Sequence, residues 1–393
     1  MQKSIPRISE KEKAYVDEVL DSQFRTSAGG KMTKRLEELF AQMFNVEYAI
    51  SFINGTATLH AALAAAGVGP GDEVIVPPLT MSSTSFAVLH ADAIPVFADI
   101  DPFTWTISPH SIIERITPRT KAIIPVAIYG LSPDMDAIMD VATQYHLFVL
   151  EDDAQCFLGY YKGKIVGSLG HAASFSFQSS KHMSSGEGGM VTTNDMELAN
   201  KIRRFNSLGY AAVGAKEGKI TKETIQDPKY ERHASVGWNY RMPELCAAVA
   251  LGQLERLRDL VDFRIRSAAL FADAVSGCQW LVPQSVPEGY THSYWSYVLK
   301  LINHDISWYD FRRKYLEFGG DGYYAAWQLT YLEPAFRDVT FKVAQPQIYA
   351  PGLCPVAESI QPRLIQLKTN YFNVDEMEVQ AEALMKTIKY FDT

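Results

Sequence analysis

The sequence has few cysteines, no long apolar run and no leader-like segment, and each absence excludes a class of protein. The four cysteines (Cys156, Cys246, Cys278 and Cys354) lie far apart and form no CxxC pair, which argues against a disulfide framework and a structural zinc site. No stretch approaches the roughly 20 apolar residues that a membrane helix needs, and the first residues contain no apolar segment typical of a secretory signal. We therefore expect a cytoplasmic protein with no membrane association and no metal.

The charge and the length of the chain exclude further classes of protein. The net charge is −8 and no long basic run occurs, whereas nucleic-acid binding needs a clustered basic surface. Apolar residues make up 47% of the 393-residue chain and charged residues 21%, which is typical of a globular protein. A chain of this length exceeds one small core, so we expect a large domain and a smaller one, and no nucleic-acid partner.

Patterns typical of strands and helices alternate through the first part of the chain. Short apolar runs are followed by segments with helical spacing of apolar residues, and this alternation predicts a mostly parallel sheet covered by helices on both faces. We place this α/β domain at residues 1–255, with helices over 10–22 and 32–43 at its start. A smaller domain is expected at 256–393, and one long helix over 242–261.

The first candidate site is Asn54-Gly55-Thr56-Ala57, between an expected strand and an expected helix. Glycine lets the backbone approach a ligand closely. Thr56 is placed to cap the helix, whose first N–H groups and positive dipole end attract anions. An ordinary helix cap without a ligand is the alternative interpretation.

The second candidate is the acidic segment 151–155 (EDDAQ), which follows an apolar strand. In an open parallel sheet, ligands bind beyond the carboxyl ends of the strands, and a carboxylate placed there needs a cationic partner. A protonated pyridine ring is one such partner. An exposed acidic turn is the alternative.

The strongest candidate is Lys181, in a Ser/Gly-rich turn that follows a strand (SFSFQSSKHMSSGEGG, 174–189). The neighbouring hydroxyl and N–H groups suit a phosphate. Partial burial and cationic neighbours would lower the pKa of the lysine and supply the neutral amine that Schiff-base formation needs. A solvated surface lysine is the alternative. Asn239 and Arg241, just before the helix expected at 242, are either caps or ligands.

Together these segments resemble the DegT/DnrJ/StrS family of sugar aminotransferases, within the fold-type-I (aspartate-aminotransferase-like) enzymes that use pyridoxal 5′-phosphate (PLP). Several blocks match in order and spacing over roughly residues 5 to 270, which is far more specific than any single motif. The resemblance implies a seven-stranded type of mostly parallel sheet in the large domain and an α+β small domain. The matching blocks are GTATLHAAL (55–63), GPGDEVIVP (69–77), ITPRTKAIIPV (116–126), EDDAQ (151–155), SFSF…K…GEGG (174–189) and GWNYRMPELCAAVALGQLERL (237–257).

The resemblance also implies an activity and residue roles. It implies transfer of an amino group by PLP from a donor such as L-glutamate to a keto-sugar, in most members nucleotide-linked, in amino-sugar, polysaccharide or secondary-metabolite biosynthesis. Lys181 would form the Schiff base and Asp152 would keep the pyridine nitrogen protonated. Asn239 stands where the second subunit reaches the phosphate, which implies a homodimer with shared active sites. The full implied cofactor-binding set is Gly55, Thr56, Ala57, Met81, Asp152, Gln155, Ser176, Lys181 and Asn239.

Departures from the family pattern occur near the cofactor ring and near the acceptor site. Met81 falls where an aromatic residue often stacks on the cofactor ring, and residues 323–334 (YYAAWQLTYLEP) differ from the family near the acceptor site. We interpret the aromatics of that segment either as small-domain core or as a platform for the acceptor. The polar segment 210–232 is expected to be a long surface loop whose lysines (Lys216, Lys219 and Lys222) meet an anionic group such as a diphosphate.

Three alternatives stay open at this point. A cyclitol ketone is an alternative acceptor. A PLP-dependent sugar dehydratase is disfavoured, because family members that dehydrate sugars carry histidine in place of the lysine that is present here as Lys181. A non-enzymatic PLP-binding homologue is the least favoured, because Asp152, Ser176 and Lys181 are all present.

Overall fold

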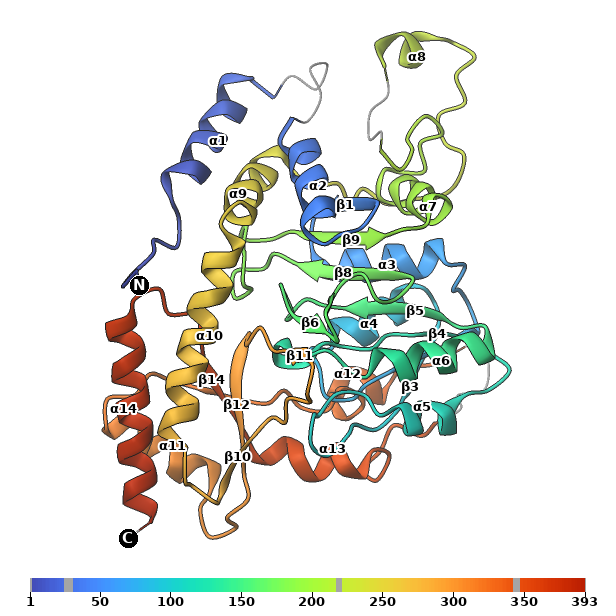
Figure 1. Cartoon of the computed structure of the whole chain (residues 1–393). Coiled ribbons are helices and arrows are strands. Elements are labelled where there is room, and N and C mark those ends of the chain that lie inside the picture. The colour runs from blue at the N-terminus through green and yellow to red at the C-terminus, as the bar shows by residue number, and fades with distance from the viewer. Residues whose placement is uncertain (1, 25–30, 217–220, 342–346, 393) are drawn as a thin grey trace.

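A seven-stranded sheet forms the centre of the computed structural model, which describes residues 2–24, 31–216, 221–341 and 347–392 (Figure 1). The strand order is β1-β9-β8-β5-β4-β2-β3. Only β9 runs antiparallel to its neighbours, and the other pairs are parallel. The expected seven-stranded, mostly parallel sheet is therefore confirmed. Its strands are β1 (Tyr48–Phe52), β2 (Glu73–Val76), β3 (Ile94–Phe97), β4 (Thr120–Ile123), β5 (Phe148–Asp152), β8 (Ala172–Ser176) and β9 (Gly189–Thr193).

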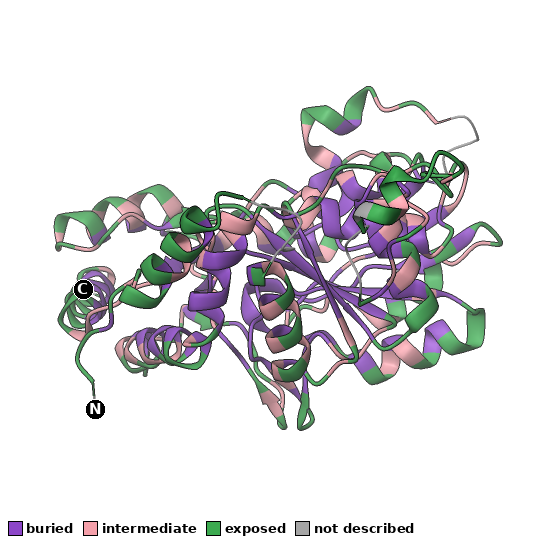
Figure 2. Cartoon of the chain, turned by 90° about the horizontal axis from the view of Figure 1, so that it is seen from above, coloured by how far each residue is buried: buried purple, intermediate pink, exposed green. Residues whose placement is uncertain are grey.

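Both faces of this sheet are buried, which is why its strands read as continuous apolar runs. Because side chains alternate along a strand, Ile50 packs on one side and Ala49 on the other. One face packs against α3 (Gly55–Ala65), α4 (Ser83–His90) and α7 (Met196–Asn206). The opposite face is covered in one half by α5 (Pro109–Arg115) and α6 (Met135–Tyr145), and in the other by α2 (Lys31–Met43) and α9 (Glu244–Leu254). Figure 2 shows this buried interior between exposed outer helix faces.

The C-terminal part of the chain builds a second, antiparallel sheet. Its order is β10-β12-β14-β13, and α10 (Leu257–Ala274), α11 (Trp308–Glu317) and α14 (Val374–Phe391) enclose a core against it. The sheet and its helices have the expected α+β composition. The strands are β10 (Leu281–Pro283), β12 (Ser296–Leu301), β13 (Tyr324–Ala325) and β14 (Leu364–Lys368).

The boundary at residue 255 stays a prediction, because the chain crosses between the two cores more than once. A segment between β13 and β14, which holds α12 (Pro334–Arg337) and α13 (Pro355–Ile360), contributes Leu329, Phe336 and Ala357 to the core of the large sheet. The N-terminal residues instead lie beside α14: Ile5 N–H donates to the carbonyl of Phe372 and Val374 N–H to that of Lys3 (both 2.9 Å).

The remaining elements are short or peripheral. They are α1 (Glu10–Asp21), α8 (Lys222–Gln226) and a three-stranded sheet of β6 (Tyr160–Tyr161), β7 (Lys164–Ile165) and β11 (Tyr290–Thr291). The helices expected over 10–22 and 32–43 are present as α1 and α2. None of the helices in the described ranges is both long and apolar enough to cross a membrane.

The long helix expected over 242–261 is wrong, because the structure breaks it between Leu254 and Leu257. Arg256 leaves helical geometry with φ −122° and ψ 19°. Its side chain donates to the buried carboxylate of Glu12 (3.0 Å) and to the carbonyl of Pro6 (2.6 Å). Contacts with the N-terminal segment therefore determine where the helix ends.

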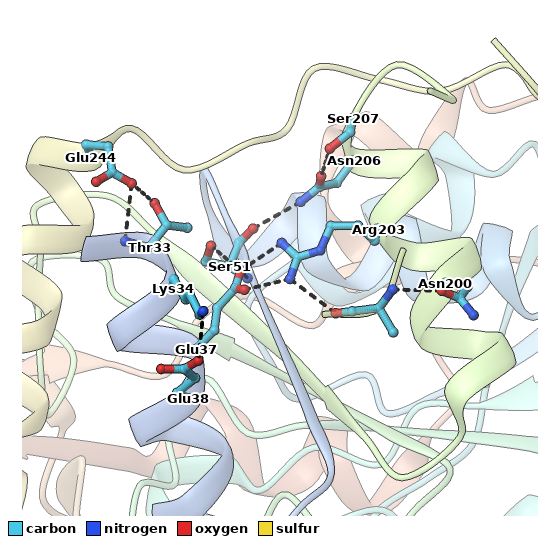
Figure 3. Close-up of polar contacts among 11 residues, drawn as sticks. Thr33, Lys34, Glu37, Glu38, Ser51, Asn200, Arg203, Asn206, Ser207 and Glu244 are labelled. Atoms are coloured by element: carbon cyan, nitrogen blue, oxygen red, sulfur yellow. Dashed lines mark hydrogen bonds and ion pairs between the residues drawn. The ribbon is translucent and has the colours of Figure 1, made fainter. Parts of the chain in front are cut away.

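A buried ion pair ties α2 and α7 to β1 (Figure 3). The guanidinium of Arg203 donates to both carboxylate oxygens of Glu37 at 2.8 and 2.6 Å, and Glu37 also accepts from the backbone and hydroxyl of Ser51, each at 2.8 Å. Asn206, on α7, donates to the carbonyl of Ser51 (3.0 Å). Tyr240 N–H then donates to the carbonyl of Asn206 (2.9 Å). The ion pair thus helps to hold the end of α7, to which residues 237–241 are attached by backbone hydrogen bonds.

We expect Glu37→Gln to lower the free energy of unfolding by about 3 kcal/mol, because it leaves the charge of Arg203 buried without its partner. Urea denaturation followed by circular dichroism measures the loss. The matched control is Glu38→Gln on the same helix, whose ion pair with Lys34 is exposed and should change stability by less than about 1 kcal/mol. Equal losses in the two variants would contradict this account.

Candidate functional site

The carboxyl ends of β1, β5 and β8 meet at one edge of the large sheet, and the predicted site residues lie there. β5 ends at Asp152, β8 ends at Ser176, and β1 leads into Asn54 and Gly55. Asp152 is in register with Ser174 on the neighbouring strand. This is the edge of an open parallel sheet at which ligands bind.

The start of α3 lies directly against the end of β8. A methyl group added at Gly55 would come within 2.8 Å of the Ser176 Cβ, so only glycine allows this approach. The predicted cap at Thr56 is wrong: Asn54 is the N-cap, and its side-chain oxygen accepts from the N–H of Ala57 at 2.8 Å. Because the Ala57 amide is engaged by the cap, the amides of Gly55 and Thr56 are the ones left to bind an anion.

The acidic segment 151–155 divides its carboxylates between two tasks. Glu151 accepts from the backbone N–H groups of Gly167 (3.1 Å), Leu169 (2.8 Å) and Gly170 (2.7 Å), and so holds the loop before β8. Asp152 is 4% exposed and accepts from the hydroxyl of Thr84 at 2.7 Å. Asp152 is therefore the carboxylate of this segment that belongs to the site.

Burial raises the pKa of Asp152, whereas the Thr84 hydroxyl, the Ala154 amide and the positive charge of Lys181 lower it. Thr84 stands on α4 and was not among the predicted site residues. A sequence signal for it is weak, because a threonine in the first turn of a helix is ordinary.

Lys181 lies in the turn after β8, and its amine interacts with the charge of Asp152. Burial lowers the pKa of this lysine to about 8; Asp152 and Glu187 oppose the shift, and Arg264 adds to it. The Nζ atom lies 4.9 Å from the ring centre of Trp295, and Trp295 stacks on Trp327 with ring centres 5.7 Å apart. A lysine with this pKa has a substantial neutral fraction at neutral pH, as a nucleophilic amine requires.

Gln155 and Met81 border the same edge. Gln155 is buried, and its amide oxygen accepts from the backbone N–H of Tyr129 at 2.8 Å, which directs its NH2 group away from that bond. Met81 immediately precedes the α4 segment that carries Thr84, and its side chain is half exposed. The cofactor-binding roles of both residues stay predictions.

Asn239 is exposed and lies in a segment apart from the sheet edge that carries the other candidates. Its backbone bridges to Ser207, and its neighbours Val236 and Trp238 are 90% and 50% exposed. No interaction found among the described residues joins Asn239 to Asp152, Ser176 or Lys181. Within one chain the structure therefore does not bring Asn239 into the site.

The predicted loop and aromatic segment have mixed outcomes. The loop projects from the body beside α7 and carries α8 at its tip (Figure 1); Lys216 lies over the ring of Tyr48 at 5.4 Å. Lys219 and the side chain of Lys222 fall outside the described residues.

Of the four aromatics, Tyr323 and Tyr331 are core residues and Tyr324 is exposed, which leaves Trp327, whose ring stacks on Trp295.

Two further residues of this site were not predicted. They are Trp295, which immediately precedes β12, and Arg264 on α10, and both contact the Lys181 turn. A signal for Arg264 exists in the sequence, since helical spacing places it on the apolar stripe of α10 with Leu260, Ala268 and Phe271. Within the described ranges, no group of three His, Cys, Asp or Glu side chains is placed to hold a metal ion.

Comparison with known proteins gives a consistent result. The model of the DegT/DnrJ/EryC1/StrS aminotransferase family matches residues 6–381. GDP-perosamine synthase of Escherichia coli O157:H7 is 38% identical over 290 residues, 74% of this chain and 75% of that protein. UDP-4-amino-4-deoxy-L-arabinose–oxoglutarate aminotransferase of Shewanella sediminis is 36% identical over 290 residues, 73% and 72% of the two chains. The solved aminotransferase from Psychrobacter cryohalolentis is similar with a TM-score of 0.87 and 30% identity over 99% of each chain.

We expect Gly55→Ala to weaken binding of a phosphate-bearing ligand at least about tenfold, because the added methyl group would push α3 away from Ser176 and spread the anion-binding groups apart. Fluorescence titration with PLP as the probe measures the dissociation constant. Gly69→Ala is the control, since a methyl group there meets no atom within 4 Å. Unchanged affinity in Gly55→Ala would show that the junction of α3 and β8 does not bind the phosphate.

Proposed function

Because the chain belongs to the DegT/DnrJ/EryC1/StrS aminotransferase family, it is an aminotransferase of amino-sugar biosynthesis, and we propose that it uses PLP to transfer an amino group from L-glutamate to a nucleotide-linked keto-sugar. The observation that carries the proposal is the arrangement at one sheet edge: buried Asp152 opposite Lys181, beside the junction of Gly55 and Ser176. These groups supply a carboxylate, an amine and an anion site at one sheet edge, which supports the proposal.

The chemistry of these residues fits PLP. The amides of Gly55 and Thr56 and the hydroxyl of Ser176 would bind the phosphate, and Asp152 would pair with the pyridine N–H. Gln155 would lie near the ring hydroxyl and Met81 against a ring face. PLP, when bound, serves as the electron sink for the substrate carbon that loses its proton.

The chain's own residues then direct the proton transfers. Asp152 would place a negative charge in a buried position, where it would keep a facing nitrogen protonated more effectively than it could in water. Lys181 would hold the cofactor covalently, and its amine, when free, would remove and return a proton. Its lowered pKa, about 8, suits a group that must act both as base and as acid near neutral pH.

The acceptor is proposed from the relatives and from Trp327. Two relatives are named for GDP- and UDP-linked sugars, which supports a nucleotide-linked acceptor here. Trp327 stacks on Trp295, and the Nζ atom of Lys181 lies over the ring of Trp295. An indole at that place can pack against a sugar ring.

The proposed assembly is a homodimer with shared sites. Residues 231–241 form a mostly exposed stretch that includes Trp238 and Asn239, and its partly buried Tyr240 packs against the partly buried Phe205. An exposed tryptophan beside an exposed valine is typical of a surface that another chain covers. We propose that Asn239 reaches the phosphate site of the partner subunit from this surface.

We expect the PLP-loaded protein, given L-glutamate, to convert a nucleotide-linked keto-hexose to the amino sugar, with the product identified by mass spectrometry. Lys181→Ala should lower kcat at least about a hundredfold, because the proton-transferring amine is lost. Lys162→Ala, which removes an exposed lysine paired with Asp136, should leave kcat unchanged. A preference for free cyclitol ketones would overturn the nucleotide-linked acceptor, and a deoxy product without nitrogen would indicate dehydration instead.

We expect Asn239→Ala and Lys181→Ala chains to complement each other when they are mixed under conditions that exchange subunits. If each site takes Lys181 from one subunit and Asn239 from the other, a mixed dimer regains one intact site, and random mixing should restore about a quarter of wild-type activity. Activity equal to the sum of the two separate variants would contradict shared sites. Sedimentation of a fully active monomer would do the same.

A further inference from the structure

Arg264 is a buried cation whose partners are carbonyl and hydroxyl oxygens. The side chain is 3% exposed. One terminal nitrogen donates to the carbonyl of Trp295 (2.8 Å) and to the hydroxyl of Thr369 (3.2 Å). The other donates to the carbonyls of Ser180 (2.8 Å) and Lys181 (2.9 Å). No carboxylate within the described ranges forms an ion pair with it.

A buried guanidinium without a counter-charge costs free energy, and an apolar side chain of similar length would avoid the cost. Burial lowers the pKa of Arg264, but an arginine begins so high that it stays charged at neutral pH. The fold therefore keeps a positive charge directly beneath the peptide of Lys181. That placement needs a reason beyond packing.

The hydrogen bonds of Arg264 connect the lysine turn with the small domain. Trp295 immediately precedes β12 and Thr369 follows β14, so both partners belong to the ends of small-domain strands. Ser180 and Lys181 belong to the turn after β8 of the large sheet. The indole N–H of Trp295 adds a second donor to the carbonyl of Ser180 at 3.0 Å. The backbone at Lys181 is thereby fixed by α10 and the small domain together.

We propose that Arg264 is a positioning residue for Lys181: its buried charge lies beneath the lysine peptide, and its hydrogen bonds to the carbonyls of Ser180 and Lys181 aim the lysine amine from the small domain. The proposal rests on the role of Lys181 proposed above. Arg264 does not touch the reacting atoms and acts through the lysine.

The other charged groups around Lys181 show why such a cation is useful. Asp152 on β5 and Glu187 in the loop between β8 and β9 favour the ammonium form of Lys181. The face of the Trp295 ring does the same. His182, the next residue, is buried, and burial lowers its pKa well below the usual value. Arg7 approaches from the N-terminal segment, where it donates to the carbonyl of Ser179, and lowers the pKa of Arg264. Arg264 is thus the close positive charge that offsets the two carboxylates.

The test measures the pKa of Lys181 in the cofactor-free protein. Trace acetic anhydride labels neutral amines only, so the labelling of the Lys181 peptide between pH 6 and 11, read by mass spectrometry, gives the pKa as a midpoint. In the wild type we expect a midpoint near 8. Arg264→Met should raise this midpoint by about one pH unit, because a like charge no longer opposes protonation.

Two variants separate the charge from general loosening of the turn. Arg264→Lys keeps the cation but loses the planar fork, and Trp295→Phe removes a hydrogen bond to Ser180 without changing charge; both should keep the midpoint near the wild-type value. Arg266→Met, on the same helix but bonded to Gln2 at the surface, is the matched control. An unchanged midpoint in Arg264→Met, or an equal rise in Arg264→Met, Arg264→Lys and Trp295→Phe, would overturn the proposal.

A failure of this proposal can be distinguished from a failure of the proposed function. Borohydride reduction of the PLP-loaded protein followed by peptide mapping locates the attached cofactor. A label on another lysine would remove the proposed role of Lys181. A label on Lys181 with an unchanged midpoint in Arg264→Met would remove only the role of Arg264.

Discussion

The burial of the Asp152 carboxylate is the constraint on which the rest of the site depends. A carboxylate with 4% exposure is stable only where donors and a cation surround it. Here the hydroxyl of Thr84 comes from α4, the amide of Ala154 from the segment after β5, and the charge of Lys181 from the turn after β8. The strand order places β8 next to β5, so the lysine turn lies beside the carboxylate because of the topology and not because of a flexible loop.

The same edge shows which parts of the molecule a sequence specifies by itself. The strands were predictable because burial on both faces requires continuous apolar runs. Lys181 and Asp152 were predictable because their chemical types follow strand ends in a particular order. The N-cap of α3 was misassigned by two residues, since both asparagine and threonine cap helices and only the exact end of β1 decides between them.

Other features depend on contacts with distant residues. The apolar spacing continues through Glu255 and Arg256, and the helix breaks there because Glu12, 244 residues away in the chain, accepts from Arg256. Thr84, Trp295 and Arg264 reach Asp152 and Lys181 from separate segments, so no local pattern connects them. For Arg264 a clue was present in its place on an apolar helix stripe, but the same pattern also describes an arginine whose stem covers the core.

The pairing of residues 3–5 with residues 372–374 has a consequence for folding. Residues 3–5 hydrogen-bond with residues 372–374, at the start of α14. During synthesis the large sheet can collapse as soon as β9 emerges, since domains tend to fold in the order in which they leave the ribosome. Residues 3–5, however, can form these hydrogen bonds only after residues 372–374 have been translated. The pairing of these two segments therefore comes later than the formation of the large sheet.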